Sequence, residues 1–139
     1  MLLSFDTDNI LYRVLSDSVA LKSALTGGIY NTARPDNSDK EDITVNTISV
    51  NGDMPQRGTS NVNIHVADLR LTIKGQEQRK VNRERLRELT ELAISALEAA
   101  NVEGLLFWVS NTSIIAEPSA NQHYANLRID WNIQKTKNH

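Results

Sequence analysis

The chain has 139 residues, of which 40% are hydrophobic and 23% charged, a balance typical of a folded globular domain. Its 15 basic and 17 acidic side chains give a formal charge of −2, which argues against a general nucleic-acid binder. The absence of cysteine excludes disulfides, zinc–thiolate sites and thiol catalysis. No apolar run has the length of a membrane span and the first residues do not resemble a signal peptide, so we expect one soluble, intracellular domain over residues 1–139.

Helical periodicity opens the chain. Apolar residues recur at helical spacing over residues 6–25, and the polar residues 16–18 interrupt them. This pattern predicts a helix followed by a short second helix or a kinked continuation. The two glycines at 27–28 end the region, because glycine tolerates the conformation found just past a helix end. A short strand is expected at 28–30, followed by a polar loop at 31–42.

Two alternating segments then predict strands. Residues 43–50 alternate apolar and polar side chains, with a change of parity near Thr47 that indicates either a bulge or a strand covered on both faces. The turn-rich residues 51–60 predict a long hairpin arm. Residues 62–73 alternate again, and a second change of parity at 67–68 predicts another bulge within one strand.

The second half of the chain starts with a long amphipathic helix, predicted over residues 76–100. A short strand is predicted at 105–109, which residues 112–116 either continue or restart. The last strand is predicted at 125–133, and its strict alternation is typical of a half-buried antiparallel strand. Trp131 lies on the apolar parity of that strand and is expected in the core. Trp108 has the opposite parity to its apolar neighbours, so it either packs under a second helix or anchors an interface.

The resulting order is α-β-β-β-α-β-β. A chain with this order is expected to form an α+β fold, with one antiparallel-rich sheet and helices packed on one of its faces.

The histidines show no spacing typical of a metal or catalytic site. His65 and Asp68 have opposite strand parity, which points them to opposite faces. We therefore interpret His65, His123 and His139 as isolated surface or edge residues. We expect no cofactor and no metal ion.

Two charged clusters have opposite sign. The acidic side chains of loop 31–42 are Asp36, Asp39, Glu41 and Asp42. Their spacing is not that of the ligands in a calcium-binding loop. At the predicted helix start, where the helix dipole favours acids, the basic side chains are Arg79, Lys80, Arg83, Arg85 and Arg87. Helical pairing of Lys80 with Glu84 and of Arg87 with Glu91 would offset part of this charge. The basic cluster is either a solvated face or a contact surface for nucleic acid or for the acidic loop of a neighbouring copy.

The order of these segments resembles that of the small tail-terminator and tail-completion proteins of long-tailed bacteriophages and prophages. The matching parts are a first helix over 15–25 leading into a strand at Gly28–Tyr30, and a loop containing Arg34 and Pro35 before the strand at 43–45. They continue with the strand at 62–69, the helix at 81–97 and two closing strands that end at Ile133. The resemblance is one of pattern and order rather than of a single motif.

The resemblance implies a structural protein without enzymatic activity. Copies would close into a ring, typically a hexamer, at the head-proximal end of the tail tube, with DNA passing through it. The ring would end tube polymerisation and contact the tail tube protein and the head-connector proteins. It would be found in the host cytoplasm during assembly and then in the virion tail.

We expect its contact surfaces at the acidic loop, the 51–60 arm and the basic helix start. The residues concerned are Asp36, Asp39, Glu41, Asp42, Asp53, Met54, Arg57, Arg79, Lys80, Arg83 and Arg87.

Two alternatives belong to other functional classes. The basic helix start fits a nucleic-acid-associated module, whose binding would weaken steeply with salt. A small enzyme would need a concave pocket that brings His65 or His123 next to a carboxylate.

Overall fold

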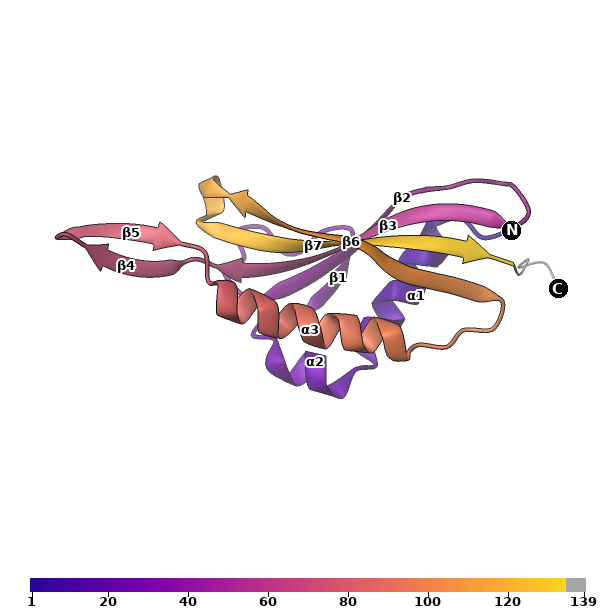
Figure 1. Ribbon diagram of the computed structural model, residues 1–139, viewed down its shortest axis with the longest axis horizontal. Helices are drawn as coiled ribbons and strands as arrows, with labels where there is room; N and C mark the ends of the chain where they lie inside the picture. The colour runs from indigo at the N-terminus through magenta and orange to yellow at the C-terminus, as the bar shows by residue number, and fades with distance from the viewer. Residues whose placement is uncertain (135–139) are drawn as a thin grey trace.

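A computed structural model describes residues 1–134, which form a five-stranded sheet with helices packed against one face (Figure 1). The helices are α1 (Ser4–Ser16), α2 (Val19–Ala24), α3 (Arg83–Ala99) and the 3-10 turn η1 (Pro118–Ala120). The strands are β1 (Ile29–Asn31), β2 (Asp42–Val50), β3 (Gln56–Ala67), β4 (Leu69–Ile73), β5 (Gln76–Lys80), β6 (Leu105–Glu117) and β7 (Gln122–Ile133).

The main sheet has the order β1-β2-β3-β7-β6. Only the short β1–β2 pair is parallel among the described strands, and the other pairs are antiparallel. The predicted α+β class, with an antiparallel-rich sheet and helices on one face, is confirmed.

The expected break in the N-terminal helical region lies where the polar residues interrupt the period. Helix α1 ends at Ser16 and α2 begins after Ser18, whose hydroxyl accepts a hydrogen bond from the Leu21 backbone N–H at 3.2 Å. This side-chain cap satisfies one of the N–H groups left free at the start of a helix. The apolar side chains of Leu11, Leu15 and Leu21 are completely buried.

The core lies between the helices and the alternate residues of the central strands. Ile64 on β3, Leu127 on β7 and Leu89 on α3 are completely buried. Trp131 lies in this core as predicted, and its indole N–H donates to the hydroxyl of Ser60 at 2.9 Å. A buried Trp can therefore keep its one polar atom paired.

Trp108 lies on the other parity of β6 and is 45% exposed, so no second helix within residues 1–134 covers it.

The predicted bulge near Thr47 is confirmed, because the β2–β3 register shifts between Thr47 and Ser49. The predicted continuous strand over 62–73 is wrong. Strand β3 pairs with β7 only as far as Ala67, and the next backbone N–H, of Asp68, donates to Asn121. Beyond this point the partner strand has ended, so the chain leaves the sheet and pairs with itself.

The predicted helix over 76–100 begins too early. Residues 76–80 form β5, which pairs with β4 in a separate two-stranded sheet. Lys74 and Gly75, with φ of +52° and +77°, form the turn between the two strands. Two successive positive φ values suit the tight turns that match strand twist. Helix α3 starts at Arg83, after Asn82, whose side chain accepts from the Arg85 backbone N–H at 3.2 Å.

The predicted arm at 51–60 is also shorter than expected, because β3 already begins at Gln56. The hairpin that projects from the molecule is β4–β5, which extends beyond the sheet at one end of the long axis (Figure 1).

Candidate assembly surfaces

The projecting hairpin, residues 69–80 and called the arm below, has one apolar row. Leu69, Leu71 and Ile73 point to the same face and remain 41%, 39% and 37% exposed. Across the hairpin they face Lys80, Gln78 and Gln76. A two-stranded hairpin is marginally stable on its own in water, and none of the helices in the described part of the chain covers this apolar row. The arm therefore presents an exposed apolar row, which makes it a candidate contact surface.

The opposite face of the arm is charged. Glu77 lies between two guanidinium groups, 3.2 Å from Arg70 and 3.6 Å from Arg79. Together with Lys74 and Lys80 the arm has four basic side chains against one acidic, a formal charge of +3. The arm thus has an apolar row on β4 and is basic overall.

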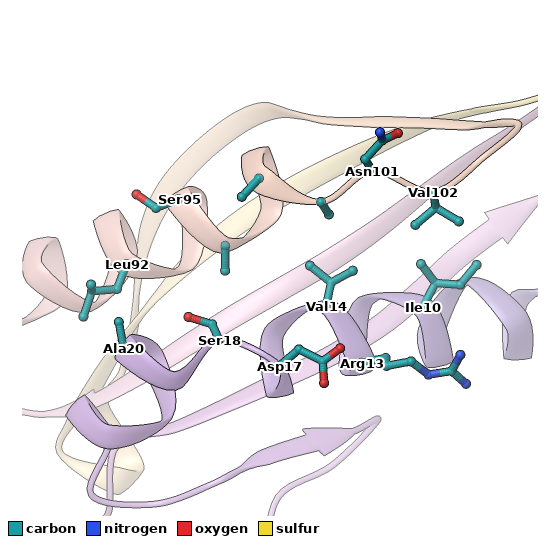
Figure 2. Close-up of a pocket in the computed structure, with 13 residues that line it drawn as sticks. Ile10, Arg13, Val14, Asp17, Ser18, Ala20, Leu92, Ser95, Asn101 and Val102 are labelled. Carbon is teal, nitrogen blue, oxygen red and sulfur yellow. The ribbon is translucent and has the colours of Figure 1, made fainter.

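A second unfilled surface is the groove between α1, α2 and the C-terminal half of α3, called the helix groove below (Figure 2). It has a volume of about 570 Å³. Figure 2 shows Ile10 and Val14 of α1 pointing toward Val102, which follows α3. Ala20 and Leu92 extend the apolar lining, and polar side chains such as Asp17, Ser95 and Asn101 stand at its edges.

A third surface is a polar pocket of about 850 Å³ between loop 31–42 and the sheet face that the helices leave open. Arg34 reaches down from the loop to Asp42 at 3.3 Å and also donates to the side chain of Gln122. Asp42 is 1% exposed and accepts further bonds from the Ser38 hydroxyl and the Gly28 backbone N–H. These bonds satisfy the buried carboxylate and hold the loop on the sheet.

The neighbouring acidic residue of the loop is also engaged within the chain. Glu41 accepts two hydrogen bonds from Arg85, at 2.6 Å from Nε and 2.7 Å from Nη2. Hydrogen bonding to Glu41 raises the pKa of Arg85 above its ordinary value. The pair ties the loop to the first turn of α3, since a bidentate contact fixes both orientation and distance.

The prediction that the histidines are isolated is wrong for His65 and His123, which both contact carboxylates. His65 is 8% exposed, with Nδ1 3.1 Å from Glu117 and Nε2 3.3 Å from the hydroxyl of Thr44. Burial lowers the pKa of His65, as does the charge of Arg34, while Glu117 and Asp42 act in the opposite direction.

His123 contacts Asp68 at 2.6 Å. His139 lies outside the described residues. The His65–Glu117 pair joins β3 to β6, and the His123–Asp68 pair joins β7 to the residue between β3 and β4, so sequence spacing contained no signal for either pair.

His65 and Glu117 line the polar pocket, which is the kind of site that the enzyme alternative requires. The hydroxyl next to His65 belongs to Thr44, a buried residue of a central strand that is only 6% exposed. We interpret this chain of contacts as a network that stabilises the sheet.

The other predicted contact residues lie in two places. Asp53, Met54 and Arg57 are exposed at the β2–β3 turn, which lies at the end of the molecule away from the arm (Figure 1). Arg79 and Lys80 belong to the arm, so the helical pairing expected between Lys80 and Glu84 does not apply.

Arg83 and Arg87 are exposed on α3, and Arg87 pairs with Glu91 at 2.7 Å as expected. Asp36 and Asp39 are exposed on the loop. The involvement of all these residues in subunit contacts remains a prediction.

Within residues 1–134, no group of three or more histidine and acidic residues could hold a metal ion. None of the helices in that range is long and apolar enough to cross a membrane.

No protein-family model matches the sequence, and no curated protein matches it either. Among solved structures, the fold is similar to that of a chain in the virion of a native gene transfer agent (GTA) particle, with a TM-score of 0.53. The two chains are 10% identical, and the match covers 88% of this chain and 90% of that one. The two proteins share a fold over nearly their whole lengths.

Proposed function

We propose that the chain is a structural subunit of a phage or phage-like virion. The observation that carries this proposal is the exposed apolar row of the arm, which no other element of the described chain covers. The likeness to a chain of the GTA virion supports it. Such a row is stabilised when a neighbouring molecule covers it.

In its finer form, the proposal is that copies close into a ring, typically a hexamer, at the head-proximal end of a tail tube. There the ring stops tube polymerisation and joins the tube to the head connector, while DNA passes through its centre. The arm and the other surfaces differ from one another, so subunits associate head to tail rather than through one shared patch. Such contacts form a ring when the rotation closes. In this proposal the polar pocket around His65 has a structural role and no catalytic one.

The charge of the arm favours one second candidate, a nucleic-acid-associated module. Its four basic side chains give it a formal charge of +3, whereas the whole chain is at −2. Binding to duplex DNA with a steep salt dependence at low protein concentration would favour this function over assembly.

Light scattering after size-exclusion chromatography, over a concentration series, tests the ring. The expected result is one discrete oligomer. In a second assay, adding this oligomer to polymerising tail tube protein is expected to shorten the tubes. Reversing the charge of Arg83 and Arg87 is expected to weaken assembly, while Lys22→Glu on the exposed side of α2 serves as the control. A chain that stays monomeric at every concentration and leaves tube length unchanged would contradict the proposal.

A further inference from the structure

We propose that the open face of the main sheet has a binding site for a neutral saccharide, formed around Trp108 and Asp130. The site lies on the side of the sheet opposite the helix groove. Saccharide binding is a function in addition to the proposed role in a virion and does not depend on that role.

Strand register places four polar or aromatic side chains in one row across the sheet. Ser49 of β2 is paired with Thr59 of β3, which is paired in turn with Asp130 of β7. Trp108 of β6 completes the row as the partner of Asp130. Directly paired residues of antiparallel strands point to the same face, and this face is opposite the one on which Trp131 is buried. The row therefore runs from two hydroxyls through a carboxylate to an indole.

A pocket of about 390 Å³ lies over this row, and its lining also includes Arg57. Such a volume is within the range of about 300–1,000 Å³ that is typical of small-molecule sites. Within residues 1–134, no side-chain hydrogen bond or ion pair engages Trp108, Asp130 or Arg57. The indole N–H, the carboxylate and the guanidinium group are therefore all free to contact a ligand.

The charges at the site select a neutral, polar ligand. A phosphate or carboxylate group would be repelled by Asp130, and an ammonium group would be repelled by Arg57. A purely apolar ligand would cover both charged groups and leave them without hydrogen-bond partners, which is costly. The ligand that fits has no net charge and offers both donors and acceptors.

The exposed indole of Trp108 narrows this class to saccharides. A sugar ring has a flat face of C–H groups, which suits the negative face of an aromatic π-system, and hydroxyls around its rim. Those hydroxyls can donate to the carboxylate of Asp130 and accept from the guanidinium of Arg57. An extended peptide would instead pair with the backbone along the free edge of β6, whereas this row crosses the strands.

Neutral amides continue the site along the same face. Asn126 of β7 donates to the side-chain oxygens of Asn61 and Asn63, at 3.1 Å and 2.7 Å. The amide N–H groups of Asn61 and Asn63 donate no hydrogen bond within residues 1–134. Further sugar units can bind to these groups, so an oligosaccharide is expected to bind more tightly than a single sugar.

A glycan array probed with the full chain tests the class of ligand. The array carries neutral hexose and N-acetylhexosamine series, from single sugars to hexasaccharides, beside sulfated and sialylated glycans. Binding to at least one neutral series, increasing with the number of sugar units, is expected. An array on which no neutral oligosaccharide binds would overturn the proposal.

Isothermal titration calorimetry with the neutral hexasaccharide that binds best tests the residues. Trp108→Ala removes the flat aromatic surface and is expected to weaken binding at least about tenfold, whereas Trp108→Phe should retain most of the affinity. Leu106→Ala is the matched control, because Leu106 is exposed on the same face of β6 but does not line the pocket. Equal affinities for Trp108→Ala and the unmodified chain would overturn the proposal.

Salt dependence and oligomeric state separate a saccharide from other occupants. Affinity for a neutral sugar is expected to change less than about twofold between about 50 mM and about 500 mM salt, since screening acts on charged ligands. A steep fall with salt would identify a charged ligand and overturn the proposal. Trp108→Ala is also expected to leave the oligomer fraction unchanged. A loss of oligomer in this variant would assign Trp108 to a subunit contact and overturn the saccharide site, while the ring proposal would stand.

Discussion

The main sheet and the arm share one sequence pattern, but they bury it differently. On β3 and β7 the apolar residues of the alternation, such as Val62 and Leu127, are completely buried under the helices. On β4 the corresponding row of Leu69, Leu71 and Ile73 is more than one third exposed at each position. Alternation therefore indicates a strand with two unlike faces. Whether the apolar face becomes core or contact surface depends on the layer that the topology places over it.

The largest expected effect lies in the sheet. Leu127→Ala removes a completely buried side chain beneath the helices and is expected to destabilise the fold by about 2–5 kcal/mol. Urea unfolding followed by circular dichroism measures this loss. Leu106→Ala is a matched control, because Leu106 is 61% exposed on the neighbouring strand β6 and should cost far less. Equal losses from the two variants would show that the helix-covered face is not the stabilising one.

A smaller effect is expected on the open face of the sheet, where His65 faces Glu117, Asp42, Arg34 and Tyr124. Burial holds the pKa of His65 below its ordinary value, so the unfolded chain takes up a proton that the folded chain resists. The stability contributed is full above the histidine pKa of the unfolded chain, about 6.5, and is lost as the pH falls toward the lowered pKa.

His65→Gln is therefore expected to lessen the fall in melting temperature between about pH 7.5 and about pH 5.5. Thermal unfolding of both proteins across this range measures the difference. An unchanged slope would mean that carboxylates elsewhere account for the whole pH dependence.

Local patterns were sufficient for much of the fold. The alternation at 125–133 predicted the half-buried strand β7. The parity change near Thr47 predicted the bulge in β2. The helix expected at 76–100 failed at its start, because Gln, Glu, Arg and Lys are all good helix formers. The turn at Lys74 and Gly75 decided the conformation there. It pairs residues 76–80 with β4, and this pairing outweighs the helix propensity of those residues.

The surfaces were less predictable than the fold, because their contacts depend on register. The Glu41–Arg85 pair joins residues 44 positions apart, and the His65–Glu117 contact spans 52. Residue types alone predicted that the acidic loop is a contact surface. The structure shows that Glu41 and Asp42 are engaged within the chain. The apolar row of the arm was visible in the sequence, but its exposure follows only from the way the chain leaves the sheet after Ala67.

The smallest effect on stability, and the sharpest contrast with Leu127→Ala, is expected in the arm. Leu71→Ser changes a side chain that no layer covers, so the free energy of unfolding of the monomer should shift by no more than about 0.5 kcal/mol. The same substitution removes the centre of the apolar row and is expected to lower the oligomer fraction in sedimentation velocity. Thr72→Ser on the opposite face should leave both quantities unchanged. If Leu71→Ser instead destabilised the monomer as Leu127→Ala does, the arm would be part of the core, and the contrast between the two regions would be lost.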